Sequence, residues 1–374
     1  MKNLNIIFIV ILFIWASFFI EPLQSRYYLS MEIILFLVFV DVWARKGNAI
    51  FKSGSIPLWV FIISLSLNVF FVVTKEKTST AYLNIALPMV FIYYITSETI
   101  CDEYAFYFLA RTICICSIFI ALIWITGRIV ATEHIYKLNP KVLASCLVYS
   151  WPFSLFLFKR DKGVYRRLAM ASLILGTLVI ILTFSRMALF GLVAMITFYF
   201  VIHRKYILLK LFYGILLIIA FISSIFSYPF NSFSIGYMIV DGQTSVFSVW
   251  NLTKFMIMLD KIKEHPFIAM GLRNGEIFNN TYLTILAESG IIGFSGFLLF
   301  ILYLFRILWK NLKLSDSESQ KRWFLVAVFM SYIGLLIDMI GYDVIYWSSP
   351  YLYFCILTGL ITALCSKNYN ICVK

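Results

Sequence analysis

The segment that decides the fold joins a polar stretch to an apolar helix and reads, from residue 264 to residue 293, EHPFIAMGLRNGEIFNNTYLTILAESGIIG. It begins inside residues 227–280, the one long hydrophilic interval in the second half of the chain. It ends in an apolar run that still carries a carboxylate, Glu288. An ionisable side chain inside a membrane span is costly and usually has a function, so chemistry is expected at this junction.

The composition predicts a membrane protein. The 374 residues are 62% hydrophobic and 13% charged, and the mean hydropathy is +0.92, far outside the range of soluble globular proteins. Apolar runs long enough to cross a hydrocarbon layer of roughly 30 Å recur along the chain. We therefore expect an all-α, polytopic transmembrane helical bundle, with residues 1–374 forming a single integral membrane domain.

Twelve spans are expected. They lie near residues 4–21, 27–44, 57–74, 81–97, 105–126, 141–158, 167–184, 187–203, 207–226, 281–305, 323–341 and 350–366. A single helix over both 167–184 and 187–203 would be far longer than a membrane is thick, so a tight reversal is expected near Ser185.

The basic residues predict the orientation of these spans. They gather in the loops that follow even-numbered spans, as at Arg45, Lys46 and Lys52, at residues 159–167, at Arg204 and Lys205, and at residues 306–322. The positive-inside rule makes these loops and both termini cytoplasmic. Residues 227–280 then form a large outer loop, in which residues 249–262 are expected to be an interfacial helix. The net charge of +13 therefore indicates orientation rather than nucleic-acid binding.

Three cations of the outer face are candidate ligands for phosphate. Arg186 stands at the boundary of two apolar spans, where it is either a bidentate phosphate clamp or a snorkelling anchor. Arg273 lies between two turn-forming glycines, and Lys254 lies on the expected interfacial helix. Both of these can also be read as solvated charges.

Asn280, Thr284 and Glu288 are spaced to lie on one helical stripe. Glu288 is either a proton acceptor with a raised pKa, a partner for a cation such as Arg273, or part of a structural ion pair. Asp343 either borders the same cavity or is a solvated loop charge.

Neither a cofactor nor a metal is predicted. The sequence contains no Walker loop, GxSxG or HExxH motif, and its seven cysteines include no CxxC pair. Gly290, Gly293 and Gly296 form a small-residue face, which is typical of close helix packing.

Several of these motifs, in this order, resemble the O-antigen polymerase and ligase family. The similar segments are Asn139-Pro140, Thr183-Phe184-Ser185-Arg186, Glu264-His265-Pro266, Asn279-Asn280-Thr281-Tyr282-Leu283 and Glu288-Ser289-Gly290. The motifs cover about residues 135–300, and the plan of twelve spans with one large outer loop extends the likeness to the whole chain.

The resemblance implies a GT-C-like, metal-independent glycosyltransferase of the bacterial inner membrane, with its active site on the periplasmic face. Its implied partners are undecaprenyl-diphosphate-linked oligosaccharides, membrane lipid, a chain-length regulator and a flippase, and no nucleic acid. The implied catalytic residues are Arg186, Arg273, Glu288 and Asn279, and the implied substrate-binding residues are Ser185, Lys254, Asn280, Tyr282, Glu276 and Asp343.

Two positions depart from the pattern of the family. Asn279 stands where ligases carry a histidine, and Asn251 stands where an arginine is common. The leading expectation is therefore a repeat-unit polymerase for O-antigen or a similar surface polysaccharide, and the alternative is the ligase that transfers the polymer to lipid A-core. A transporter or flippase is expected instead to show repeat-related halves with broken helices, and the sequence shows no internal repeat.

Overall fold

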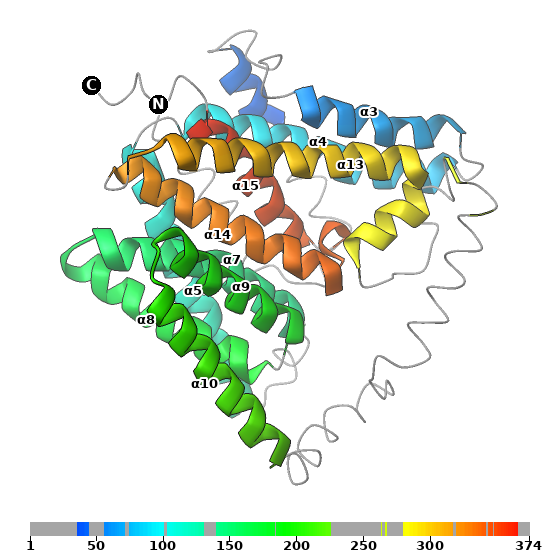
Figure 1. Cartoon of the computed structure of the whole chain (residues 1–374). Helices are drawn as coiled ribbons and strands as arrows, with labels where there is room; N and C mark the ends of the chain where they lie inside the picture. The colour runs from blue at the N-terminus through cyan, green and yellow to red at the C-terminus, as the bar shows by residue number, and fades with distance from the viewer. Residues whose placement is uncertain are drawn as a thin grey trace. The chain divides into compact units, whose positions relative to one another are not determined.

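The structure is a computed structural model in which every described secondary-structure element is a helix (Figure 1). It describes residues 36–44, 56–71, 75–100, 103–130, 140–183, 185–225, 263, 266–267, 280–316, 319–341, 343–346 and 348–365. Within these residues there is no strand, which confirms the all-α class.

The labelled helices fall close to the predicted spans. They are α3 (Ile56–Phe71), α4 (Lys75–Thr99), α5 (Glu103–Val130), α7 (Pro140–Arg160), α8 (Gly163–Leu182), α9 (Arg186–Ile202), α10 (Tyr206–Ile225), α13 (Thr281–Leu314), α14 (Gln320–Gly341), the short 3-10 helix η3 (Val344–Tyr346) and α15 (Ser348–Cys365). A further helical segment covers residues 36–44.

Five of the described helices are long and apolar enough to cross a membrane: α5, α7, α8, α13 and α14. Shorter apolar helices, including α9, accompany them. A helical protein with membrane-spanning segments is thus supported, whereas twelve spans remain a prediction. The predicted span 4–21 and the expected interfacial helix at 249–262 lie outside the described residues.

The chain divides into two compact units. The first contains residues 1–195 and 261–374, and the second contains residues 196–260. In the second unit the end of α9 contacts α10, since the Thr197 and Tyr213 hydroxyls are 2.8 Å apart. The single membrane domain predicted for residues 1–374 stays a prediction.

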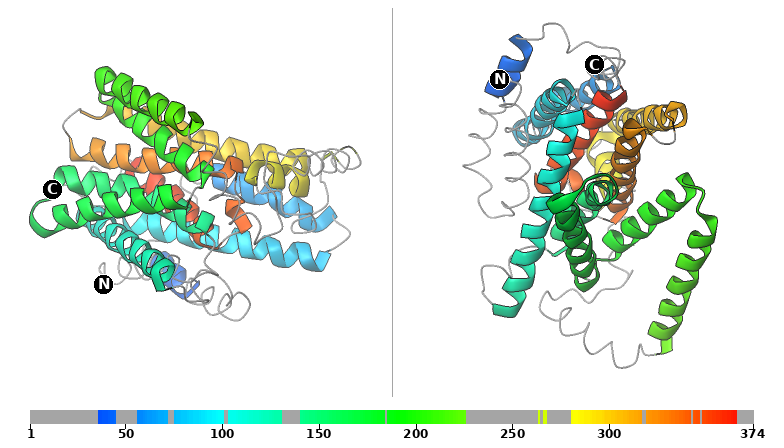
Figure 2. Two further views of the ribbon diagram at one scale, coloured as in Figure 1. Left: turned by 90° about the horizontal axis from the view of Figure 1, so that it is seen from below. Right: turned by 90° about the vertical axis from the view of Figure 1, so that its left-hand side faces the viewer.

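Two groups of helices in the first unit are linked by α14 and by a direct contact between α7 and α15. One group contains α3, α4, α13 and α15, and the other contains α5, α7 and α8, as two further views also show (Figure 2). Helix α14 packs against α13 and α15 on one side and against α7 on the other.

Close approach between helices depends on glycine. A Cβ placed on Gly296 of α13 would lie 2.9 Å from Cβ of Ser64 in α3, and one on Gly359 of α15 would lie 2.7 Å from Cβ of Thr96 in α4. Both separations are below van der Waals contact, so no larger residue fits there without displacement. The packing role predicted for Gly296 is confirmed.

Helices α13 and α14 run antiparallel. Near the start of α13, the Tyr282 hydroxyl donates to the carbonyl of Leu336 (3.1 Å). Further along, the Tyr332 hydroxyl donates to the carbonyl of Ile301 (3.1 Å). The start of α13 therefore lies beside the end of α14.

Helices α7 and α9 also run antiparallel to α14. The Phe156 ring near the end of α7 lies 4.8 Å from that of Phe324 near the start of α14. Met187, at the start of α9, fills the space beside Gly341 at the end of α14. At one end of the first unit, α7, α9 and α13 begin and α14 ends. We call this end the site end. The opposite end, where α7 stops and α8 begins, is the turn end.

Candidate site at the start of helix α13

Asn280 and Tyr282 attach the start of α13 to the end of α14. The Asn280 side chain caps α13 by accepting from the backbone amide of Leu283 (3.0 Å), and its Nδ2 donates to the carbonyl of Ile340 (2.6 Å). The Tyr282 hydroxyl donates to Leu336, as described above. Both residues were predicted to bind substrate. In this structure their polar atoms fix the geometry of the site end.

Asp343 is a buried residue, with 0% of its surface exposed, so its interpretation as a solvated loop charge is wrong. The Thr284 hydroxyl donates to its Oδ2 (2.8 Å), while among the described residues its Oδ1 accepts no hydrogen bond of normal geometry. The next residue, Val344, donates its backbone amide to the Thr281 hydroxyl (2.9 Å). These contacts hold the segment after α14 against the first turn of α13.

Burial also changes the acidity of Asp343. It raises the pKa of this carboxyl from 3.8 to about 6, because desolvation disfavours the charged form. The Thr284 hydroxyl and the backbone amide of Ile345 act in the opposite direction, since both favour the carboxylate. Asp343 therefore titrates in the mildly acidic range.

Glu288 is also buried, with 3% of its surface exposed. It lines a small cavity with room for about one water molecule, together with Phe61, Leu65, Ile85, Thr284, Ile285 and Ile345. Thr284 thus contacts Asp343 and lines the cavity beside Glu288, which confirms that positions 284 and 288 lie on one helical stripe. The cavity is too small for a sugar, so Glu288 has no room for a glycan in this state.

Helix α13 is interrupted directly after Glu288 and Ser289. Gly290 has φ +65° and ψ −171°, a conformation accessible essentially only to glycine. The backbone amides of Ile291 and Ile292, which lose their helical partners at this break, point to the carbonyls of Pro266 (3.0 Å) and Phe267 (3.5 Å).

The break at Gly290 was not predicted from the sequence. Gly290 was assigned to a packing face together with Gly293 and Gly296, and a glycine pattern does not distinguish packing from a break. The contacts to Pro266 are made by the backbone, so no side-chain pattern reports them. They nevertheless bring Pro266, the last residue of one motif, beside the residues that directly follow Gly290, the last residue of another.

Ser185 and Arg186 form the reversal between α8 and α9. Helix α8 stops at Leu182 and α9 starts at Arg186, which confirms the predicted break. Ser185 is buried and its carbonyl accepts from the Leu189 amide (3.0 Å), whereas Arg186 is exposed. Since Met187 packs beside Gly341, the Arg186 backbone lies at the site end near the end of α14.

A second buried carboxylate network links α14 to α7. The Tyr149 hydroxyl lies 2.5 Å from Oδ2 of Asp338, and the Ser331 hydroxyl donates to the Tyr149 carbonyl (2.7 Å). Tyr149 could not be identified from the sequence, because a tyrosine in an aromatic-rich span carries no signal of its partner.

Four predicted site residues, Lys254, Arg273, Glu276 and Asn279, lie outside the described residues and stay predictions. Among the described residues, no group of three or more His, Cys, Asp or Glu side chains could hold a metal ion.

The site end therefore contains the exposed Arg186 and the first turns of two helices. Arg186 is the first residue of α9, and the N-termini of α9 and α13 carry partial positive charge that favours anions. The start of α13 is held in place by two contacts. Asn280 binds the carbonyl of Ile340 in α14, and Thr284 binds Asp343 in the segment after α14. Such an arrangement is suited to holding a phosphate group at the surface of a helical bundle.

Comparison with known protein families finds no family model that matches the chain, and comparison with curated proteins finds no match.

Proposed function

We propose that the protein is a repeat-unit polymerase for O-antigen or a similar surface polysaccharide, acting at the periplasmic face of the bacterial inner membrane. It would transfer the growing glycan from undecaprenyl diphosphate to the next lipid-linked repeat. The proposal rests on the sequence resemblance described above, because the comparisons provide no relative.

One structural observation supports the proposal most directly. Ser185 and Arg186 come from one motif of the sequence, and Asn280 comes from another about a hundred positions later. Met187 contacts Gly341, while Asn280 binds the carbonyl of the neighbouring Ile340 at 2.6 Å. Two motifs far apart in the chain thus meet at one end of the first unit.

In the proposed reaction, a hydroxyl of the acceptor repeat attacks the anomeric carbon of the donor glycan. The bond between that carbon and the diphosphate oxygen breaks, and undecaprenyl diphosphate leaves with the bonding electron pair. The Arg186 guanidinium would hold the diphosphate and stabilise its developing charge, which is a preorganised electrostatic role. The hydroxyl proton passes to a base or to water.

Glu288 and Asp343 were predicted to act on or near the substrate. Glu288 is buried beside a cavity that excludes a sugar. Asp343 is buried and accepts from Thr284 in the first turn of α13, so we assign Asp343 to positioning that turn. A role for Glu288 as proton acceptor would require this cavity to open toward the acceptor hydroxyl.

The test is a strain that lacks the gene, complemented with wild type, Arg186→Ala, Arg186→Lys or Arg306→Ala. Arg306 is the matched control, since it is an exposed arginine of α13 toward the turn end. Membranes are immunoblotted for insertion, and the surface polysaccharide is separated on a ladder gel.

We expect Arg186→Ala to abolish long polymer and Arg306→Ala to leave it unchanged. Arg186→Lys should retain only part of the polymer, because lysine keeps the positive charge but lacks the bidentate fork. In the deletion strain, one capped repeat on the core supports the polymerase. Bare core with accumulating lipid-linked polymer would support the ligase instead. Unaltered ladders in the deletion strain would exclude both, and unaltered polymer in Arg186→Ala would refute the clamp.

The transporter alternative predicts broken helices, and α13 is broken at Gly290. Discontinuous helices in transporters direct free helix ends at their substrates. Here the freed amides of Ile291 and Ile292 face the carbonyls of Pro266 and Phe267, so the break is already occupied by the protein. The break therefore offers no free helix end to a transported substrate.

A further inference from the structure

The turn between α7 and α8 concentrates positive charge at the turn end of the first unit. Helix α7 ends at Arg160 and α8 begins at Gly163, so two residues connect two helices that can each cross a membrane. Residues 159–167 contain five cations and one acid: Lys159, Arg160, Lys162, Arg166, Arg167 and Asp161. Such a turn lies where the headgroups of the bilayer would be.

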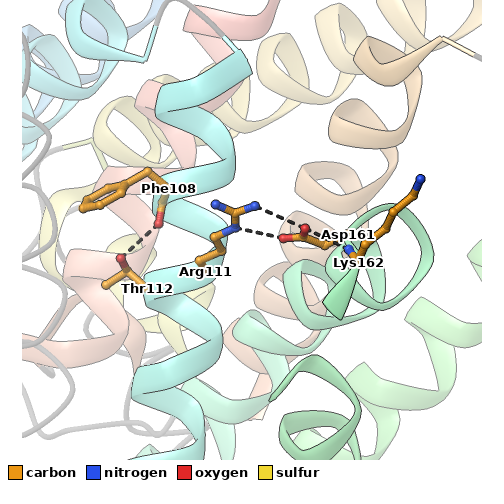
Figure 3. A network of polar contacts seen from close by, with 5 residues as sticks. All are labelled: Phe108, Arg111, Thr112, Asp161 and Lys162. Atoms are coloured by element: carbon orange, nitrogen blue, oxygen red, sulfur yellow. Dashed lines mark hydrogen bonds and ion pairs between the residues drawn. The ribbon is translucent and has the colours of Figure 1, made fainter. Parts of the chain in front are cut away.

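The one acid of this turn is already neutralised. Arg111 of α5 makes a bidentate pair with Asp161, Nε to Oδ2 at 2.8 Å and Nη2 to Oδ1 at 3.1 Å (Figure 3). Oδ1 of Asp161 also accepts from the backbone amide of Lys162 (2.9 Å), and the Arg111 guanidinium lies over the Tyr165 ring at 4.1 Å. The turn is thereby fixed to α5 in one geometry.

Four of the five cations of the turn are exposed: Lys159, Lys162, Arg166 and Arg167. Within the described part of the chain, none of these four has a carboxylate at ion-pair distance. The cationic groups of Lys159 and Arg166 both lie over the Phe158 ring, at 5.7 and 5.3 Å from its centre, which holds them near one another. An anion at this turn would therefore meet Lys159 and Arg166 already held at one ring, with the exposed Lys162 and Arg167 next to them in the sequence.

An apolar surface begins directly beside these cations. Met170, Ile174, Leu178 and Ile181 of α8 are 49%, 59%, 44% and 49% exposed. Their spacing places them on one side of α8, a helix long enough to cross a membrane. Cations next to a long exposed apolar stripe match the two parts of a phospholipid, an anionic headgroup and its acyl chains.

We propose that the α7–α8 turn is a binding site for an anionic phospholipid, with Lys162, Arg166 and Arg167 contacting the headgroup phosphate. The acyl chains would follow the exposed stripe of α8. A loop that served membrane orientation alone would need positive charge but no fixed shape. The Arg111–Asp161 pair supplies that fixed shape, and this proposal is independent of the polymerase function.

The experiment uses the purified full-length protein in detergent, titrated with phosphatidylglycerol or with phosphatidylcholine and followed by native mass spectrometry of lipid-bound species. We expect wild type to bind phosphatidylglycerol more tightly than phosphatidylcholine. Since each surface cation contributes about fivefold, Arg166→Gln with Arg167→Gln should weaken phosphatidylglycerol binding about 25-fold. Lys310→Gln with Lys313→Gln is the matched control, because it removes two exposed cations from α13 toward the turn end.

Asp161→Asn separates a built site from general attraction. This change raises the net positive charge of the turn but breaks the bidentate pair with Arg111. A built site binds phosphatidylglycerol more weakly after this change, whereas a diffuse positive field binds it more tightly. Tighter binding by Asp161→Asn would overturn the proposal. Equal weakening by the Lys310 and Lys313 control would overturn it as well.

The double variant Arg166→Lys with Arg167→Lys keeps the positive charge that governs membrane insertion. It therefore tests the site even if the glutamine variants fail to fold. We expect it to bind phosphatidylglycerol severalfold more weakly than wild type, because lysine cannot make a bidentate contact with phosphate. Binding equal to wild type would refute the assignment of these two guanidiniums to the headgroup.

Discussion

Replacing Gly290 with alanine tests whether the break in α13 is required by the fold. An alanine held at φ +65° and ψ −171° costs about 1–3 kcal/mol in backbone strain. If the helix straightened instead, it would lose the contacts of Ile291 and Ile292 with Pro266 and Phe267, each a net contribution of about 0.5–1.5 kcal/mol. Either way we expect destabilisation of about 1–3 kcal/mol.

The measurement uses the native cysteines. Cys114, Cys116, Cys146 and Cys355 are free and buried, so a thiol-reactive dye reports their exposure on heating. We expect Tm of Gly290→Ala to fall by about 2–10 °C. The control is Gly176→Ala in α8, where an added Cβ meets nothing within 4 Å and should be neutral or stabilising. Equal Tm values for the two variants would show that the break carries no conformational requirement.

Two further predictions concern a buried acid and a helix contact. Burial raises the pKa of Asp343 from 3.8 to about 6 in the folded state, so the stability that this group contributes is complete below pH 3.8 and is lost as the pH rises to about 6. The Asp343→Asn variant should lack this pH dependence, which amounts to about 3 kcal/mol. The measurement compares the free energies of unfolding of wild type and variant across this pH range. A wild-type profile matching that of the variant would contradict the raised pKa. Gly359→Ala should destabilise by about 1–3 kcal/mol, since its Cβ would lie 2.7 Å from Cβ of Thr96 and 2.9 Å from the carbonyl of Tyr93; a Tm like that of Gly176→Ala in the dye assay would argue against a tight α4–α15 contact.

The helical plan could be predicted from the sequence because hydropathy and length constrain it strongly. The break near Ser185 followed from the excessive length of one helix over residues 167–203, and the structure ends α8 at Leu182 and starts α9 at Arg186. The stripe of Thr284 and Glu288 followed from helical spacing. In these cases, the physical constraint acts on positions along one helix.

Three features that depend on contacts between separate segments could not be predicted. Asp343 is polar and follows a glycine and a tyrosine, so its local sequence is that of an exposed loop, yet Thr284 of another helix buries it. The break at Gly290 is completed by backbone groups of Pro266 and Phe267, which any residue could supply. Tyr149 became recognisable as a partner of Asp338 only once α7 and α14 were seen side by side.

The position of α7 has a consequence for how the protein is made. Of the five helices that can cross a membrane, α7 has the lowest hydropathy and is the most enclosed by the rest of the protein. During synthesis it emerges well before α14, the helix whose Asp338 pairs with Tyr149. Nascent α7 must therefore remain beside α5 and α8, or within the translocation machinery, until α14 arrives. Chains that stop before α14 should be cleared by membrane proteases, however well their first helices insert.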